Sequence, residues 1–218
     1  MLKFTIFCLA VSLAAAATAP RWSDLSAPDF RRQPELDARI DVAAFDRGLM
    51  AAAIFHETNR VREKSGLSLF RRLPRLDEAA ELEAAVGKVY QPPSHTNPFP
   101  LIGTPAARVK FVGLKARKVA ENIALLSIYD VAAGIGVGVT EREGRKQAVH
   151  PRTLEELSPA TYRGFAANVV QAWMDSPGHR ANVVDPALAY LGCSVQPAVS
   201  FMGVDNLFCV QVFFTPMK

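Results

Sequence analysis

The sequence predicts an α+β fold in which helices cover both faces of a β-sheet. Two late segments, residues 191–195 and 207–214, are continuous apolar runs without polar alternation, and such runs are typical of strands that are buried on both sides. Apolar residues recur at helical spacing over residues 42–64 and 76–90 and in the segment that ends at Trp173. A chain of 218 residues is long enough for one domain with a substantial core.

Residues 1–19 have the layout of a secretory signal peptide. Lys3 precedes an apolar run over residues 4–13, and small residues follow up to Ala19. The run is too short to cross a bilayer comfortably, and no other long apolar run follows it. We therefore expect a secreted or periplasmic protein with no transmembrane span after signal removal. The next segment, residues 20–41, is polar and contains three prolines, so we expect a leader that lies over the surface or is partly disordered.

Residues 42–64 are predicted to form the first long helix. Its apolar stripe includes His56 and Asn59, so we interpret His56 as a hydrogen-bonded core residue. The second helix, residues 76–90, is stopped by Pro92. His95 follows it in a loop.

Residues 103–118 form a basic segment that carries Arg108, Lys110, Lys115, Arg117 and Lys118. Such a run is usually a solvated face, although it could also attract an anionic phospholipid or an acidic polysaccharide. It lacks the interleaved aromatic residues that single-stranded nucleic-acid binding requires. Together with the signal peptide, this argues against a nucleic-acid partner.

The centre of the chain is predicted to hold a short helix and a β-hairpin. We expect the helix at residues 121–129, with Glu121 in its first turn. Residues 133–150 contain a Glu143-Gly144 turn between polar flanks, which favours a hairpin. The glycines before this turn lack the spacing of a dinucleotide-binding loop.

A helix break is predicted directly after Trp173. Ser176 has a capping side chain and Pro177 suits the first position of a new helix. His179 would then lie in the first helical turn, where the positive end of the helix dipole favours the neutral imidazole. A neutral imidazole can bind a metal or accept a proton.

Cys193 and Cys209 are the two cysteines that remain when the signal peptide, with Cys8, is removed. In an oxidising compartment they are expected to form a disulfide, which by the chain-entropy model would stabilise the fold by roughly 3 kcal/mol. Two buried free thiols are the alternative.

Four groups of residues, in this order, resemble the bacterial branch of the CAP superfamily, also known as the SCP or cysteine-rich secretory protein, antigen 5 and pathogenesis-related 1 domain. They are Asn59 with Arg62, the 94–96 loop around His95, residues 121–124, and residues 173–182 with the later 192–195 and 208–213 runs. The resemblance covers roughly residues 45–214. It implies a CAP domain over residues 42–218 with a three-layer α-β-α sandwich, in which the hairpin at 133–150 is an insertion.

The same resemblance implies a cleft, because two histidines and two acidic residues line the centre of this family's domain and bind a divalent metal in some members. Here the matching residues are His95, Glu121 and His179, which would suit Zn²⁺ or another divalent cation, with Asn122, Ser176 and Arg180 beside them. The second acid is replaced by Ser176, and this weakens a catalytic interpretation. No catalytic residue is therefore assigned. A purely structural hydrogen-bonded cluster is the alternative to a ligand site.

Our leading hypothesis is a secreted binding module rather than an enzyme. Family resemblance associates such modules with lipids or sterols and with extracellular interactions, so a lipid or small hydrophobic ligand would need an apolar groove beside the cleft. One alternative is a metal-dependent peptidase or esterase. Another is a scaffold that contacts an extracellular protein or an anionic glycan through the hairpin.

Overall fold

The computed structural model describes residues 22, 25–89, 93–131, 136–201 and 204–217. The predicted signal peptide lies outside these residues. Within the described part of the chain, no helix combines the length and apolar character needed to cross a bilayer.

A four-stranded sheet forms the centre of the molecule, in the order β1-β5-β6-β2. Its members are β1 (Arg71–Arg72), β2 (Ala116–Ser127), β5 (Tyr190–Phe201) and β6 (Val204–Pro216). The three long strands are antiparallel, whereas β1 runs parallel to β5 and pairs only with Tyr190 and Leu191. The apolar runs at 191–195 and 207–214 lie in β5 and β6, as predicted. β6 contributes buried apolar residues to the cores on both faces of the sheet, whereas those of β5 belong to one of the two cores.

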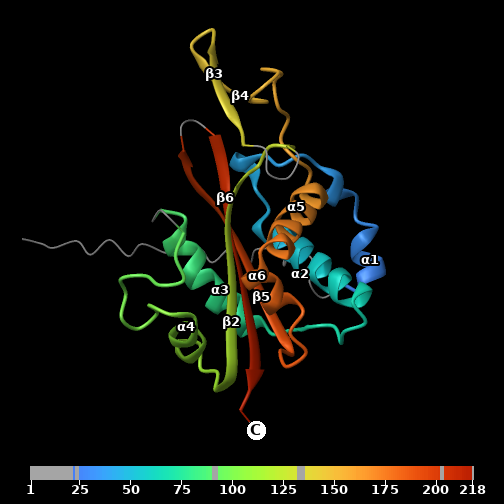
Figure 1. Cartoon of the computed structure of the whole chain (residues 1–218), viewed down its shortest axis with the longest axis vertical. Helices are drawn as coiled ribbons and strands as arrows, with labels where there is room; N and C mark the ends of the chain where they lie inside the picture. Colours follow the sequence, from blue (N-terminus) through green and yellow to red (C-terminus); the bar gives the residue numbers. More distant parts are fainter. Residues whose placement is uncertain (1–21, 23–24, 90–92, 132–135, 202–203, 218) are drawn as a thin grey trace, which may run out of the picture.

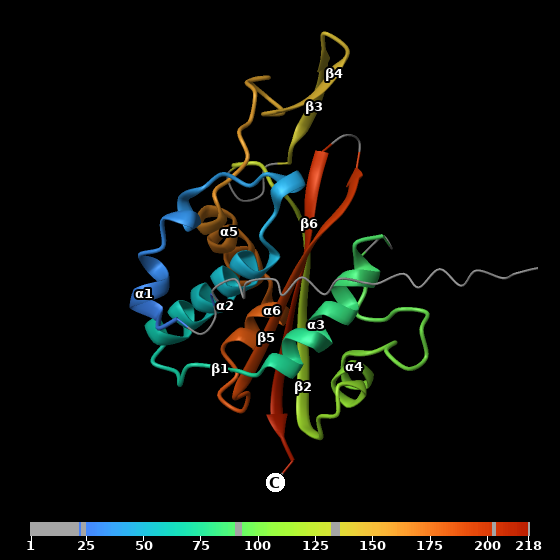
Figure 2. The same cartoon turned by 180° about the vertical axis from the view of Figure 1, so that it is seen from behind.

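Helices cover both faces of this sheet (Figure 1). One core joins the sheet to α2 (Arg47–Lys64), α5 (Tyr162–Asp175) and α6 (Pro177–Val183). The other joins it to α3 (Pro74–Gly87) and α4 (Pro105–Phe111), as the reverse view also shows (Figure 2). The α-β-α sandwich predicted from the sequence is thereby confirmed.

The close fit of α3 on the sheet explains a glycine in the 192–195 motif. A Cβ atom on Gly192 would lie 2.2 Å from the backbone carbon of Leu76. Any larger residue at this position in β5 would therefore push α3 away from the sheet.

The short helix predicted at 121–129 is wrong, because these residues belong mainly to β2. Glu121 pairs with Val212, and the register with β6 continues to Ser127. Alternate residues of β2 serve the two cores: Ala120 and Ala124 pack on the α2–α5 side, whereas Ile123 lies in the α3–α4 core. A short apolar run cannot be assigned to helix or strand by periodicity alone, and pairing with β6 decides the outcome here.

The segment predicted as a polar surface leader is part of the folded domain from residue 26 onward. It contains α1 (Ala27–Arg31) and a short 3-10 helix, η2 (Pro34–Asp37). A second 3-10 helix, η3 (Val42–Ala44), follows it, at the predicted start of the first long helix. Phe30, Leu36 and Ile40 are at most 3% exposed and join the core beside α2 and α5. The backbone N–H of Ile40 donates to the carbonyl of Ala160 (2.9 Å). The three apolar residues are too widely spaced in a polar context to reveal this packing from sequence.

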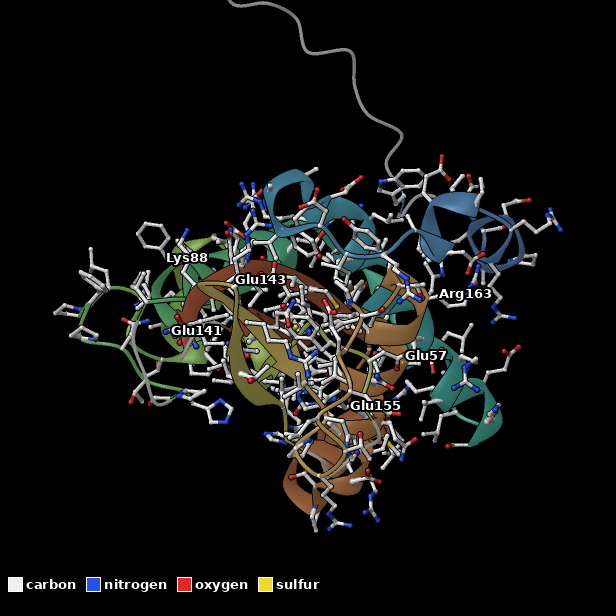
Figure 3. All side chains as sticks on the ribbon, turned by 90° about the horizontal axis from the view of Figure 1, so that it is seen from above. Glu57, Lys88, Glu141, Glu143, Glu155 and Arg163 are labelled. Carbon is white, nitrogen blue, oxygen red and sulfur yellow. The ribbon has the colours of Figure 1, made fainter. Side chains whose placement is uncertain are left out.

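The predicted hairpin is confirmed as β3 (Gly138–Arg142) and β4 (Arg145–Val149). Glu143 and Gly144 form its turn with φ values of 52° and 73°, and two successive positive φ values are typical of a type I′ turn. The hairpin projects from one end of the sandwich (Figure 1). Figure 3 views the molecule from that end and labels Glu141 and Glu143 of the hairpin.

The predicted disulfide is absent from the structure, in which Cys193 and Cys209 are free, buried thiols. Both face the α2–α5 core, but Cys193 pairs with Gln211 and Cys209 with Val195. The cysteines are therefore diagonal neighbours rather than directly opposed residues. Burial raises the pKa of both thiols well above the usual range.

These thiols are expected to be unreactive in the native protein, because a buried protonated thiol is a poor nucleophile. Titration with Ellman's reagent should find almost no fast-reacting thiol in buffer and about two per signal-free chain in guanidinium chloride. Two missing thiols under denaturing, non-reducing conditions, which return after reduction, would instead reveal a disulfide.

Candidate functional site

Glu121 and His95 form the centre of the candidate site. Glu121 lies on β2 at the edge of the sheet, with its side chain 1% exposed, whereas the side chain of His95 is 50% exposed. Nδ1 of His95 lies 2.9 Å from Oε1 of Glu121. Because a carboxylate only accepts hydrogen bonds, this contact places a proton on Nδ1 and leaves Nε2 as the second ring nitrogen.

Arg108 holds Glu121 from the other side, and the sequence analysis missed this role. Its side chain is fully buried on α4, and Nη2 donates to Oε2 of Glu121 (2.6 Å). Nη1 lies 2.7 Å from Oε2 of Glu83 on α3. One guanidinium group therefore joins two buried carboxylates. The basic segment 103–118, interpreted as a solvated face, thus contains one residue that points into the core.

The loop that carries His95 is tied to this buried group. Nδ2 of Asn97 donates to Oε2 of Glu83 (2.9 Å) and to the carbonyl of Ile102 (3.0 Å). Arg108 donates to the same carbonyl through Nη1 (2.8 Å) and to the carbonyl of His95 through Nη2 (3.4 Å). These bonds position His95 although it lies outside any helix or strand.

His179 approaches His95 from the opposite face of the sheet. It lies in the first turn of α6, and its ring centroid is 6.4 Å from that of His95. The helix break predicted after Trp173 is present, although the Ser176 side chain makes no capping hydrogen bond. Burial, followed by the nearby His95, lowers the pKa of His179. This agrees with the neutral imidazole expected from the sequence.

Two amides fasten α6 to β2 beneath the histidines. Nδ2 of Asn122 donates to the carbonyl of His179 (3.2 Å), and Nδ2 of Asn182 donates to the carbonyl of Glu121 (3.2 Å). The two side chains also bond to each other (2.9 Å). Asn122 therefore holds α6 against β2 and is not an exposed group beside the cleft. The side chain of Arg180, which was also predicted beside the cleft, donates to the carbonyl of Met174.

A comparison with protein families places the chain in one of them. The profile of the cysteine-rich secretory protein family, CAP, matches residues 55–213, which is more than half of the chain. The chain belongs to the CAP family.

Three solved structures resemble this CAP domain. An outer surface protein from Borrelia burgdorferi has a TM-score of 0.51 and 16% identity, over 83% of this chain and 99% of that one. An extracellular protein containing an SCP domain from Bacillus anthracis has a TM-score of 0.48 and 19% identity, over 77% and 41%. A cysteine-rich secretory protein from Staphylococcus aureus has a TM-score of 0.44 and 11% identity, over 78% and 40%. This chain thus spans less than half of the last two proteins. A search of curated proteins found no match.

A second carboxylate joins the Glu121 group, but it is buried, because the side chain of Glu83 is only 2% exposed. The sequence analysis found Ser176 in place of the family's second acid, but Glu83 reaches the group from α3 through Arg108. A signal for Glu83 is visible in the sequence, because it interrupts the apolar stripe of α3 between Ala80 and Ala84. A charged residue in such a stripe indicates a buried partner.

The donor set of a metal would differ from the predicted one. In the described part of the chain, no group of three or more His, Cys, Asp or Glu residues is placed to hold a metal ion. Both oxygens of Glu121 are engaged, by His95 and Arg108. Glu121 therefore fits the role of a carboxylate that orients a ligating histidine. The two imidazoles are the groups that fit a cation.

Proposed function

We propose that this CAP domain is an extracellular binding module whose cleft holds a divalent cation between His95 and His179. The signal-like N-terminus supports export. The description of the Borrelia burgdorferi protein with the same fold as an outer surface protein is consistent with such a location. A bound Zn²⁺ would supply a Lewis-acidic centre that takes further oxygen ligands from water or from a partner.

The hydrogen bond from His95 to Glu121 carries this proposal. A histidine that binds a metal through one nitrogen commonly donates its other N–H to a carboxylate, which fixes the tautomer and the ring orientation. Glu121 has this role, and its own position is fixed by Arg108 at 2.6 Å. A cluster that served only to join segments would not need two partly accessible imidazoles so close to each other.

Calorimetric titration with Zn²⁺ tests this proposal. One equivalent is expected to bind the wild-type protein, and His95→Ala and His179→Ala should each abolish stoichiometric binding. His150→Asn is the matched control, because Nδ1 of His150 accepts hydrogen bonds from the backbone N–H groups of Arg152 and Thr153, in the turn after β4, and asparagine can also accept them. Equal Zn²⁺ affinity in all four proteins, or no binding by folded wild type, would refute the cation site.

A further inference from the structure

A second candidate site lies at the opposite edge of the sheet from the histidines. It is a groove of about 820 Å³ between α2 and α3, beside β1 and β5. This volume is within the range of small-molecule sites in proteins, roughly 300–1,000 Å³. It is not the apolar groove expected beside the cleft, because it lies on the β1–β5 side of the domain.

The sequence of α2 explains why the groove is hollow. Gly48, Ala51, Ala52 and Phe55 follow one another at helical spacing and line it. Three small side chains leave space along the helix, and Phe55 adds an aromatic surface. Leu82 of α3 and Phe111 of α4 extend the apolar lining.

The charges in the groove are predominantly negative. Four carboxylates line it, from Asp46, Asp77, Glu78 and Glu81, against the guanidinium groups of Arg47 and Arg72. Arg72 pairs with Asp77 at 2.7 Å, and Arg47 lies 3.6 Å from Glu81. The other two carboxylates, of Asp46 and Glu78, are the surplus negative charges.

Groups of β5 beside the groove already bond to α3, so an added peptide strand does not fit there. Oδ1 of Asp77 accepts the backbone N–H of Cys193 (3.0 Å). Glu81 accepts hydrogen bonds from the side chains of Ser194 and Gln196. Strand addition would need free backbone groups along this edge. A compact ligand that uses the apolar lining fits better.

We propose that the groove binds a small amphiphile with a cationic head group, such as an alkylammonium. Its chain lies along the apolar surface of α2 and Leu82, and its head group is attracted by Asp46 and Glu78. Trp22 lines the same groove, with Nε1 donating to Oδ2 of Asp46 (3.1 Å). Its indole is suited to a cation–π contact with a quaternary ammonium group.

The test compares dodecyltrimethylammonium with laurate, each below its micelle-forming concentration, by calorimetry on the purified protein. The cationic amphiphile is expected to bind at least about tenfold more tightly. The formal charge of the whole sequence is +4, which on its own would favour laurate. A preference for the cationic amphiphile would therefore indicate binding in the groove.

Variants locate the binding. Ala51→Phe should fill the groove and abolish binding. Glu78→Gln should lower the affinity for the cationic amphiphile by about threefold to fivefold. Glu35→Gln, an exposed carboxylate on η2, is the matched control. Circular dichroism checks that each variant is folded. The His95→Ala, His179→Ala double variant should bind the amphiphile normally, so this proposal does not depend on the cation site. Equal or tighter binding of laurate, unchanged binding by Ala51→Phe, or no binding by wild type would overturn the proposal.

Discussion

Arg108→Met is expected to lower the free energy of unfolding by about 3–5 kcal/mol, the cost typical of breaking a buried ion pair by removing one partner. The substitution leaves Glu83 and Glu121 buried without their shared cation, although both side chains are at most 2% exposed. The carbonyls of His95 and Ile102 also lose a donor. Urea denaturation at pH 7 measures the loss.

Lys110→Met is the matched control, because Lys110 is exposed on the same helix and should change stability by only about 0.5 kcal/mol or less. The deficit of Arg108→Met should also shrink at pH 5. Unpaired buried carboxylates have raised pKa values, so they become neutral more readily as the pH falls. A loss below about 1 kcal/mol at pH 7 would mean that Arg108 does not hold the two acids.

His56 is expected to make the protein less stable in mild acid. It is 8% exposed, stacks on Phe30 at a centroid distance of 4.3 Å, and Nε2 has no hydrogen-bond partner in the described part of the chain. Burial, followed by the positive charge of Arg31, lowers the pKa of His56 to about 4. The unfolded chain would titrate near its ordinary value of 6.5. The folded state therefore favours the neutral ring.

Because the unfolded state binds the proton first, stability falls as the pH drops from 6.5 to about 4. The loss assigned to His56 is on the order of 3 kcal/mol. His56→Leu removes the titrating group and keeps an apolar side chain against Phe30. The measurement is the wild-type minus variant difference in unfolding free energy across this range. A difference that is independent of pH would contradict the buried neutral histidine.

Local signals were strong enough to predict much of this fold. The continuous apolar runs of β5 and β6, the Glu143-Gly144 turn and the break after Trp173 each depend on nearby residues. The strand β2 and the packing of Phe30 and Leu36 depend on partners far along the chain, so the sequence did not reveal them.

The residues of the candidate site were likewise only partly predictable from the sequence. Family resemblance indicated His95, Glu121 and His179, and the structure brings His95 close to both of the others. The resemblance did not indicate Arg108, which lies in a basic segment, or Glu83, which lies within the apolar stripe of a helix. Their pairing joins α3 to α4, and no local pattern records such a contact.

The most direct test of the proposed cation site is an NMR titration of the imidazole nitrogens with Zn²⁺. The expected result is a shift of Nε2 in both His95 and His179 at one equivalent, while Nδ1 of His95 remains protonated toward Glu121. Shifts in only one histidine, loss of the Nδ1 proton of His95, or unchanged spectra at saturating Zn²⁺ would contradict it.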